Sequence, residues 1–499
     1  MKKKLAILLA GALTLLTVLA GCGSSASTGA ASDAGSADAG SETAAESTAS
    51  SDAGNALDVQ VGPSPETIDP ALNSAVDGAN MILHAFEGLL KFDKDNNVVP
   101  GVAENYEVSD DGLTWTFKLR DGLKWSDGSD LTAEDFVYSW KRIADPNTAA
   151  PYGYDLLNYI KGYDAASEGD LDALAVSAPD ANTFVVELNN PCVYFDKICA
   201  FAVMVPVQKA TVEANGEAWT TNPDTYITDG PYYMTEYTDG AQIVFTKNPN
   251  YWDAANITFD TITWHLIEDS NAAYSAYQNG DLDMIKDVPT EEIPSLEGNE
   301  EFHIEPIMGT YYVTFNTQRE PFDNAKVREA LSLAIDRAYV ADTIMQGTYT
   351  PAKNFVGPGV SDEADGSSFE EVTTKEYGDH FDVTNYDADL EKAKSLLAEA
   401  GYPDGAGFPE IAYLTNDAGY HKAVAEYLQS AWGDLGITMT INIQEWKTVT
   451  ADRRSGNFDV ARNGWVYDWD DPSNMINLLE TGNGNNDGKY SNPDFDKAV

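Results

Sequence analysis

The sequence predicts an α/β protein of two lobes joined by crossing connections, and two observations support this fold class. Segments with period-two alternation, which is typical of strands, are interspersed with segments that carry apolar residues at helical spacing. Their order is irregular, with few regular βαβ repeats and no longer internal repeat. The 499 residues, 43% of them hydrophobic, are enough for two or three domains with large cores.

The clearest elements can be justified one by one along the chain. Residues 114–120 alternate as a strand, and Thr132 with Asp135 forms a capping box that opens a helix reaching Trp140. Further strands are expected at residues 183–188, 260–267 and 437–443, and further helices at residues 325–345 and 387–400, the last stopped by Gly401 and Pro403.

The N-terminus predicts export. Lys2, Lys3 and Lys4 precede an apolar run at residues 5–20 that is shorter than the roughly 20 residues needed to span a membrane. Leu-Ala-Gly-Cys22 follows directly and resembles the processing motif of bacterial lipoproteins, in which the cysteine is lipidated. The alternative is a plain secretory signal with an incidental cysteine. We expect a signal peptide at residues 1–21 and a lipid anchor on Cys22.

A tether is expected to follow the anchor. Residues 23–56 contain only small and polar residues, with no apolar side chain larger than alanine, so residues 22–56 are predicted to be a flexible acidic linker. A linker between an anchor and a folded body places that body at the outer face of the cytoplasmic membrane. Two cysteines remain, Cys192 and Cys199, and both a disulfide and two buried free thiols are open.

The charge balance excludes some partners. The chain has 81 Asp plus Glu against 30 Lys plus Arg and a net charge of -51, which argues against nucleic acid and anionic lipid headgroups. Only eight residues are arginines, and three of them, Arg453, Arg454 and Arg462, fall within ten residues.

A search for catalytic and metal motifs predicts neither an enzyme nor a cofactor. The sequence has no G-x-S-x-G, H-E-x-x-H, Walker or G-x-G-x-x-G motif, and its five histidines lack ligand spacing. Residues 93–104 imitate a calcium loop, but Val98 stands where the loop needs glycine, so a polar hairpin turn is expected there.

An ordered set of motifs is similar to the family 5 extracellular solute-binding proteins, the oligopeptide- and dipeptide-binding receptors of ABC importers. The resemblance covers roughly residues 57–499. The motifs are FEGLL at 86–90, VPGVAENY at 99–106, WTFKLR at 115–120, KWSDG at 124–128, DFVYSW at 135–140, DPNT at 145–148, GPY at 230–232, NPNYW at 248–252, NTQREPF at 316–322, EWK at 445–447 and GW at 464–465.

The resemblance implies a periplasmic-binding-protein-like fold of class II with three lobes, in which ligand is enclosed between two lobes joined by a hinge. Lobe I would comprise residues 57–86 and 209–285, lobe II residues 87–208 and lobe III residues 286–499. In the family the chain continues beyond the position of Val499 and crosses back to complete lobe I. We therefore expect the sequence to be a piece of a longer protein, with lobe III truncated.

The resemblance also implies a site for the two charged ends of a peptide. Asp468, in the segment GWVYDWDDP at 464–472, would bind the ammonium, although a solvated loop acid is the alternative. Arg453 and Arg462 fall where the family binds the ligand carboxylate, and a planar guanidinium can hold a carboxylate bidentately. Arg319 and His421 fall on further carboxylate positions. Surface ion pairing is the alternative for all four, and Arg454 is expected to be a solvated neighbour.

Between its ends the peptide would add as an extended strand. The positions that align with backbone-contacting residues of the family are Ser74, Ala75, Val76, Tyr152, Gly464, Trp465 and Val466. Trp446 and Trp465 would line side-chain pockets, with a place in the core as the alternative for Trp446.

Two other classes of function stay open. The same fold in some relatives takes oligosaccharides, nickel chelates or haem, and a surface hydrolase is a further alternative. For peptide uptake, the partners would be a peptide ligand and the permease of an ABC importer, whose ATPase is on another chain. The protein itself would be a monomer held to the membrane by its lipid.

Overall fold

The computed structural model describes residues 55–362 and 366–499. Cys22, the predicted signal peptide and nearly all of the predicted tether lie outside the described residues. Ala56, the last residue predicted for the tether, is the first residue of strand β1. In the described part of the chain, no helix has the length and apolar character needed to cross a membrane.

Predicted lobe I contributes one five-stranded sheet, in the order β11-β1-β10-β9-β8. Strand β1 lies parallel to β10 and β11, whereas β8, β9 and β10 are antiparallel neighbours. The bounds are β1 (Ala56–Gln60), β8 (Tyr232–Thr238), β9 (Gln242–Lys247), β10 (Thr261–His265), β11 (Met284–Ile285), α1 (Val76–Ala85), α6 (Lys209–Asn215) and α7 (Ser270–Asn279).

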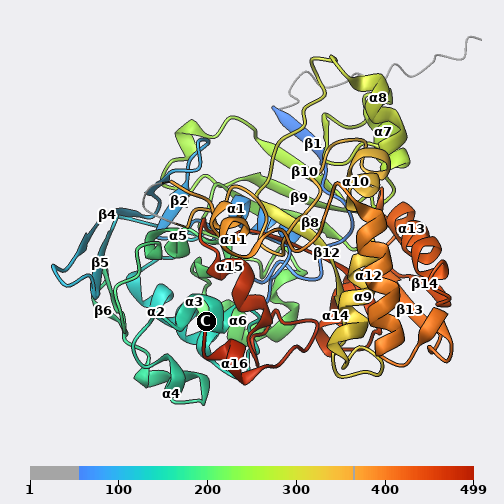
Figure 1. Ribbon diagram of the computed structural model, residues 1–499. Coiled ribbons are helices and arrows are strands. Elements are labelled where there is room, and N and C mark those ends of the chain that lie inside the picture. Colours follow the sequence, from blue (N-terminus) through green and yellow to red (C-terminus); the bar gives the residue numbers. More distant parts are fainter. Residues whose placement is uncertain (1–54, 363–365) are drawn as a thin grey trace, which may run out of the picture. The chain divides into compact units, whose positions relative to one another are not determined.

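Predicted lobe II contributes a β2-β3 hairpin and an antiparallel sheet in the order β4-β5-β7-β6, whose strands lie at the left of Figure 1. Helix α2 begins with the expected capping box between Thr132 and Asp135. The bounds are β2 (Leu90–Phe92), β3 (Val98–Pro100), β4 (Ala103–Val108), β5 (Thr114–Leu119), β6 (Val176–Asp180), β7 (Thr183–Glu187), α2 (Ala133–Ala144), α3 (Gly153–Leu157), α4 (Tyr163–Ser167) and α5 (Phe195–Cys199).

Predicted lobe III contributes a mixed sheet in the order β12-β15-β13-β14, with α9, α12 and α13 beside it at the right of Figure 1. The bounds are β12 (Gly309–Phe315), β13 (Ile411–Thr415), β14 (Met439–Ile443), β15 (Val460–Val466), α8 (Ile293–Leu296), α9 (Ala325–Leu333), α10 (Arg337–Tyr339), α11 (Phe369–Tyr377), α12 (Tyr386–Glu399), α13 (His421–Gly433), α14 (Trp446–Ser455), α15 (Ser473–Ile476) and α16 (Pro493–Asp496).

The single helix predicted at residues 325–345 is wrong. Helix α9 ends at Leu333, and Asp336 then accepts the N–H of Tyr339 at 3.0 Å, which starts the short helix α10 and a π-helical turn, Val340–Ile344. An aspartate side chain that bonds to nearby backbone competes with the continuation of a helix. The other predicted strands and helices are present, with ends shifted by at most two residues, except that the helix expected to reach Trp140 continues to Ala144.

The apolar cores divide the molecule differently from the sheets. One core runs from Val59 to Leu266 and joins the residues of predicted lobes I and II, with Trp469 added from lobe III. A second core, from Phe322 to Val460, is formed by lobe III alone. Lobes I and II therefore share one interior, and lobe III packs around its own.

Several smaller expectations can be checked on this fold. Asp93 accepts the N–H groups of Asp95 and Asn97, both at 2.9 Å, so the calcium-like segment is a polar hairpin turn. Cys192 and Cys199 are buried free thiols, and burial raises the pKa of Cys192 to about 11. Among the described residues, no group of three or more His, Cys, Asp and Glu is placed to hold a metal ion.

Candidate functional site

Asp468 lies just beyond β15, and its carboxylate accepts hydrogen bonds from two neutral side chains. Tyr152 Oη donates to Asp468 Oδ2 at 3.0 Å, and Asn474 Nδ2 donates to the same oxygen at 3.3 Å. Burial raises the pKa of Asp468 to about 7. Within the described part of the chain this carboxylate forms no ion pair, so an incoming ammonium would be its first cationic partner.

Asn474 organises this end of the site. Its Oδ1 accepts the Asp468 N–H at 3.0 Å and the Trp465 Nε1–H at 2.9 Å. The Tyr152 and Trp465 rings lie 5.6 Å apart between centroids. One asparagine thus fixes the carboxylate and the aromatic wall beside it, while Tyr152 comes from predicted lobe II.

The middle of the site is an open strand edge. Strand β15 pairs with β12 along its whole length but with β13 only at Val460 and Ala461. Beyond them, the Arg462 carbonyl accepts from Arg453 at 3.2 Å and the Gly464 N–H donates to Asn463 Oδ1 at 2.9 Å. Side chains, not a strand, satisfy this edge, which suits it to main-chain bonding with an extended ligand.

Arg462 has no ion-pair partner among the described residues, and the nearby acid Glu268 is held by Asn416, whose Nδ2 donates to it at 3.1 Å. The Arg462 Nε donates to Asn416 Oδ1 at 2.9 Å, and its guanidinium lies 4.2 Å from the centre of the Trp446 ring. Burial lowers the pKa of Arg462. A cation held by one amide and one aromatic face can accept a ligand carboxylate without breaking an existing pair.

Arg453 lies close to Arg462 but already has an amide and an acidic partner. Its Nη1 donates to Asn463 Oδ1 at 2.5 Å, and its Nε lies 3.4 Å from Asp487 Oδ2. Its guanidinium is 5.4 Å from the centre of the Trp446 ring. Trp446 therefore stands beside both arginines, and its Nε1 donates to Asp77 of α1 at 3.1 Å.

The two remaining predicted carboxylate residues differ in their surroundings. The His421 ring stacks on Tyr311 with 5.6 Å between centroids, and burial, with the nearby Arg462 and Lys286, lowers its pKa well below the usual value. His421 is therefore neutral at pH 7. Arg319 is 41% exposed and pairs with Asp459 at 2.7 Å, as in the surface alternative, so its role in ligand binding stays a prediction.

One prediction, that Arg454 is a solvated neighbour of the site, is wrong. Arg454 pairs with Glu66 at 2.7 Å and donates to Ser74 Oγ at 2.6 Å. The sequence carries no signal that joins residues so far apart.

Of the predicted backbone contacts before α1, Ala75 is extended, whereas Val76 is helical and 45% exposed. The extended backbone available to a ligand therefore ends at Ala75.

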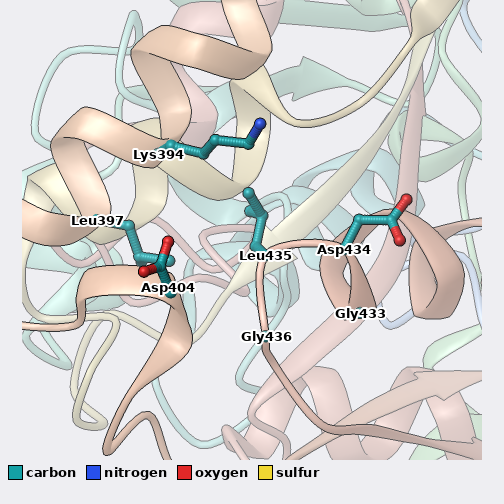
Figure 2. Close-up of a pocket in the computed structure, with 7 residues that line it drawn as sticks. All are labelled: Lys394, Leu397, Asp404, Gly433, Asp434, Leu435 and Gly436. Atoms are coloured by element: carbon teal, nitrogen blue, oxygen red, sulfur yellow. The ribbon is translucent and has the colours of Figure 1, made fainter.

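Two cavities among the described residues can be compared with the predicted site. One, of about 40 Å³, is lined by site residues that include Ser74, Arg453, Gly464 and Trp465. It has room for water rather than a peptide. Figure 2 shows the larger one, of about 290 Å³, where Lys394 of α12 lies above Leu435 near the end of α13; it shares no residue with the predicted site.

Buried amides are the functional residues that the motif comparison missed. Asn416, Asn463 and Asn474 each hold a charged side chain of the site. Asn483 and Asn485 donate to Asp155 of predicted lobe II, at 2.7 and 3.2 Å. The segment NGNN at 483–486 was a visible signal, but in sequence such an Asn- and Gly-rich segment is typical of an exposed turn.

The contact of Asp155 with Asn483 and Asn485 leads to a prediction, on the expectation that lobes II and III close around a ligand. In Asp155→Ala, two buried amides would lose their acceptor, at about 1–3 kcal/mol, so ligand affinity should fall roughly 5- to 150-fold. Calorimetry measures the affinity, and the exposed Asp164→Ala on α4 is the matched control. Unchanged affinity in Asp155→Ala would remove this contact from the closure step.

The pKa of Asp468 predicts the direction of a pH effect. An ammonium favours the ionised carboxylate, so binding lowers this pKa and releases a proton when the pH is below about 7. Affinity should therefore fall up to about tenfold per pH unit from pH 7 toward pH 5. Calorimetry in two buffers of different ionisation enthalpy counts the protons released. Burial also raises the pKa of Asp155 to about 7, so Asp468→Asn is needed to separate the two carboxylates. No proton release at pH 6 would contradict the assignment.

Comparison with known proteins identifies the family of the chain. The family model for bacterial extracellular solute-binding proteins, family 5 Middle, matches residues 97–487. The oligopeptide-binding protein OppA of Bacillus subtilis (strain 168) is 35% identical over 459 residues, which cover 89% of this chain and 81% of that protein. The matching model describes solute-binding proteins, not enzymes.

Solved structures confirm the predicted class of fold, and together with the family model they show to which family the chain belongs. The Haemophilus influenzae OppA complex with RPPGFSPFR matches with a TM-score of 0.81 at 31% identity, over 90% of this chain and 86% of that one. The Escherichia coli murein tripeptide binding protein MppA matches at 0.81 and 34% identity, over 90% and 86%, whereas its unliganded open form matches at 0.54, over 89% and 85%. The chain belongs to the bacterial extracellular solute-binding proteins of family 5.

Proposed function

We propose that the protein captures oligopeptides and delivers them to an ABC importer. The observation that carries the proposal is the pair of Asp468 and Arg462, which have no ion-pair partner among the described residues and flank the open edge of β15. A peptide supplies an ammonium, a carboxylate and main-chain groups between them. The names of the relatives, oligopeptide-binding proteins of several bacteria, support the same class of ligand.

Capture requires opening between lobe III and the other two lobes. The cavity of about 40 Å³ is too small for a peptide. Lobes I and II share one core, and polar contacts such as Tyr152 with Asp468, Arg454 with Glu66 and Asn483 with Asp155 hold lobe III against them. Polar contacts of this kind can re-form in water, so we infer that lobe III moves as a body about a hinge.

A neutral sugar is the weaker alternative. Enclosing it would leave the charges of Asp468 and Arg462 unpaired on closure, which is costly. Trp446 and Trp465 would stack on sugar rings, so the alternative needs a direct test.

Mass spectrometry of the ligand that co-purifies with the protein identifies the class of solute. Calorimetry with a mixed library of tri- to hexapeptides, against cello- and xylo-oligosaccharides, then measures affinity. Heat from peptides alone is the expected result, and heat from sugars alone would overturn the proposal. Peptide recovered intact after incubation is expected, since we assign the protein no catalysis.

The location follows from the N-terminal motif. We infer a monomer anchored by lipid on Cys22 at the outer face of the cytoplasmic membrane, where it meets the permease subunits. Mass spectrometry of the mature N-terminus should find a lipidated Cys22, and a cleaved, unmodified N-terminus would contradict the anchor.

A further inference from the structure

Asn416 links a cation of predicted lobe III to an acid of predicted lobe I. Its Oδ1 accepts from Arg462 Nε at 2.9 Å, and its Nδ2 donates to Glu268 Oε1 at 3.1 Å. Asn416 is only 1% exposed, so water has little access to either end of its amide. The three side chains form a chain of hydrogen bonds that begins at a guanidinium and ends at a carboxylate.

The two ends of this chain determine which way the Asn416 amide faces. A guanidinium only donates hydrogen bonds, and an ionised carboxylate only accepts them. With Glu268 in place, the NH2 group of Asn416 faces the acid and its oxygen faces Arg462. Among the described residues, no other acceptor bonds to Asn416 Nδ2. Without Glu268, the amide could turn and present its NH2 group to Arg462, where two donors would face each other.

The backbone that carries Glu268 is fixed on both sides. Gln60 of β1 is 1% exposed, and its Nε2 donates to the carbonyl of Ile267 at 2.8 Å. Asp269 caps helix α7, because its side chain accepts the N–H of Ala272 at 2.7 Å. Glu268 therefore has a defined place in predicted lobe I from which it reaches Asn416.

Glu268 contacts Arg462 through Asn416 and not by direct pairing. Neither side chain forms an ion pair among the described residues, and Nε is the one atom of the Arg462 guanidinium that donates a hydrogen bond to them. A direct pair would occupy the atoms with which a guanidinium holds a carboxylate bidentately. Burial raises the pKa of Glu268, and the positive charge of Arg462 opposes this rise, so the two charges interact across the amide.

We propose that Glu268 is a positioning residue for the ligand carboxylate, because it holds the oxygen of Asn416 toward Arg462 and thereby orients this guanidinium. This role rests on the proposed peptide binding, and it lets a residue of lobe I support a contact that lobe III makes. Since Glu268 and Arg462 belong to different lobes, the chain of hydrogen bonds is complete only when the lobes are closed. The movement that encloses the peptide would then also orient the cation for its carboxylate.

Calorimetry with alanine peptides of two to six residues, each in its free and its C-amidated form, tests this role. In Glu268→Ala, Asn416 loses its acceptor, and we expect free peptides to bind about tenfold more weakly. Amidated peptides, which bring no carboxylate to Arg462, should lose little. Glu268→Gln still offers an oxygen to Asn416 and should recover most of the affinity for free peptides.

Two further variants make the test specific. Glu213→Ala is the matched control, because Glu213 is an exposed acid of the same lobe that pairs with Lys209 on helix α6, and it should change neither affinity. The double variant Glu268→Ala with Arg462→Gln ties the effect to the guanidinium. Once Arg462 is lost, removing Glu268 should weaken free peptides no further.

A loss of equal size for free and amidated peptides would mean that Glu268 only holds the lobes together, and it would overturn the inference. Full affinity in Glu268→Ala, or a loss that persists without Arg462, would overturn it as well. If the unaltered protein binds no peptide at all, the proposed function fails instead, so the two failures are distinguishable.

Discussion

Replacing Asp468 by asparagine is expected to weaken peptide binding by about 2–5 kcal/mol, or roughly 30- to several-thousand-fold. The ligand ammonium would be enclosed beside Tyr152 and Asn474 with no carboxylate to pair with it. The amide has nearly the same shape, so the loss would report charge rather than packing. Calorimetry with a peptide that binds the unaltered protein measures the effect.

Asp470→Asn is the matched control for this change. Asp470 lies two residues away and accepts from Ser361, without contacting Tyr152 or Asn474. It should bind peptide as the unaltered protein does. If Asp468→Asn also keeps full affinity, Asp468 does not hold the ammonium.

The second large effect is expected at Arg462. Changing it to glutamine removes the arginine of the cluster that has no ion-pair partner among the described residues, and affinity should again fall by about 2–5 kcal/mol. The loss should be confined to peptides with a free carboxylate, because an amidated peptide makes no charge pair there. Comparing free and amidated forms in a double-mutant cycle isolates this term.

Arg328→Gln controls for the loss of an arginine from lobe III. Its guanidinium donates to the backbone carbonyls of Phe322 and Asp323 and touches no site residue. A free peptide that binds Arg462→Gln and Arg328→Gln equally well would place the ligand carboxylate elsewhere.

Local patterns in the sequence were sufficient for most of the regular elements. The capping box at Thr132 depends on only four consecutive residues, and it forms as expected. Alternation likewise located β5 and β7. The long helix at residues 325–345 failed because the apolar spacing continues through Asp336, and only the side chain that bonds to Tyr339 shows where the helix stops.

Motifs in the sequence led to candidate site residues, several of which the structure brings together, and their roles in ligand binding stay predictions. The segment at 464–472 pointed to Asp468, and the clustered arginines pointed to Arg453 and Arg462. The sequence could not show which arginine is already paired, because Asp487 lies 34 positions from Arg453, in a different loop. The same holds for Arg454 with Glu66 and for the asparagines that support the charges, whose partners are set only by tertiary packing.

The central claim is that the site recognises both charged ends of a peptide, and blocking those ends tests it most directly. Calorimetry would compare one peptide, of the length recovered from the protein, in four forms: free, N-acetylated, C-amidated and doubly blocked. We predict that each single block weakens binding by at least about tenfold and that the double block weakens it further. A doubly blocked peptide that binds as tightly as the free one would contradict the account.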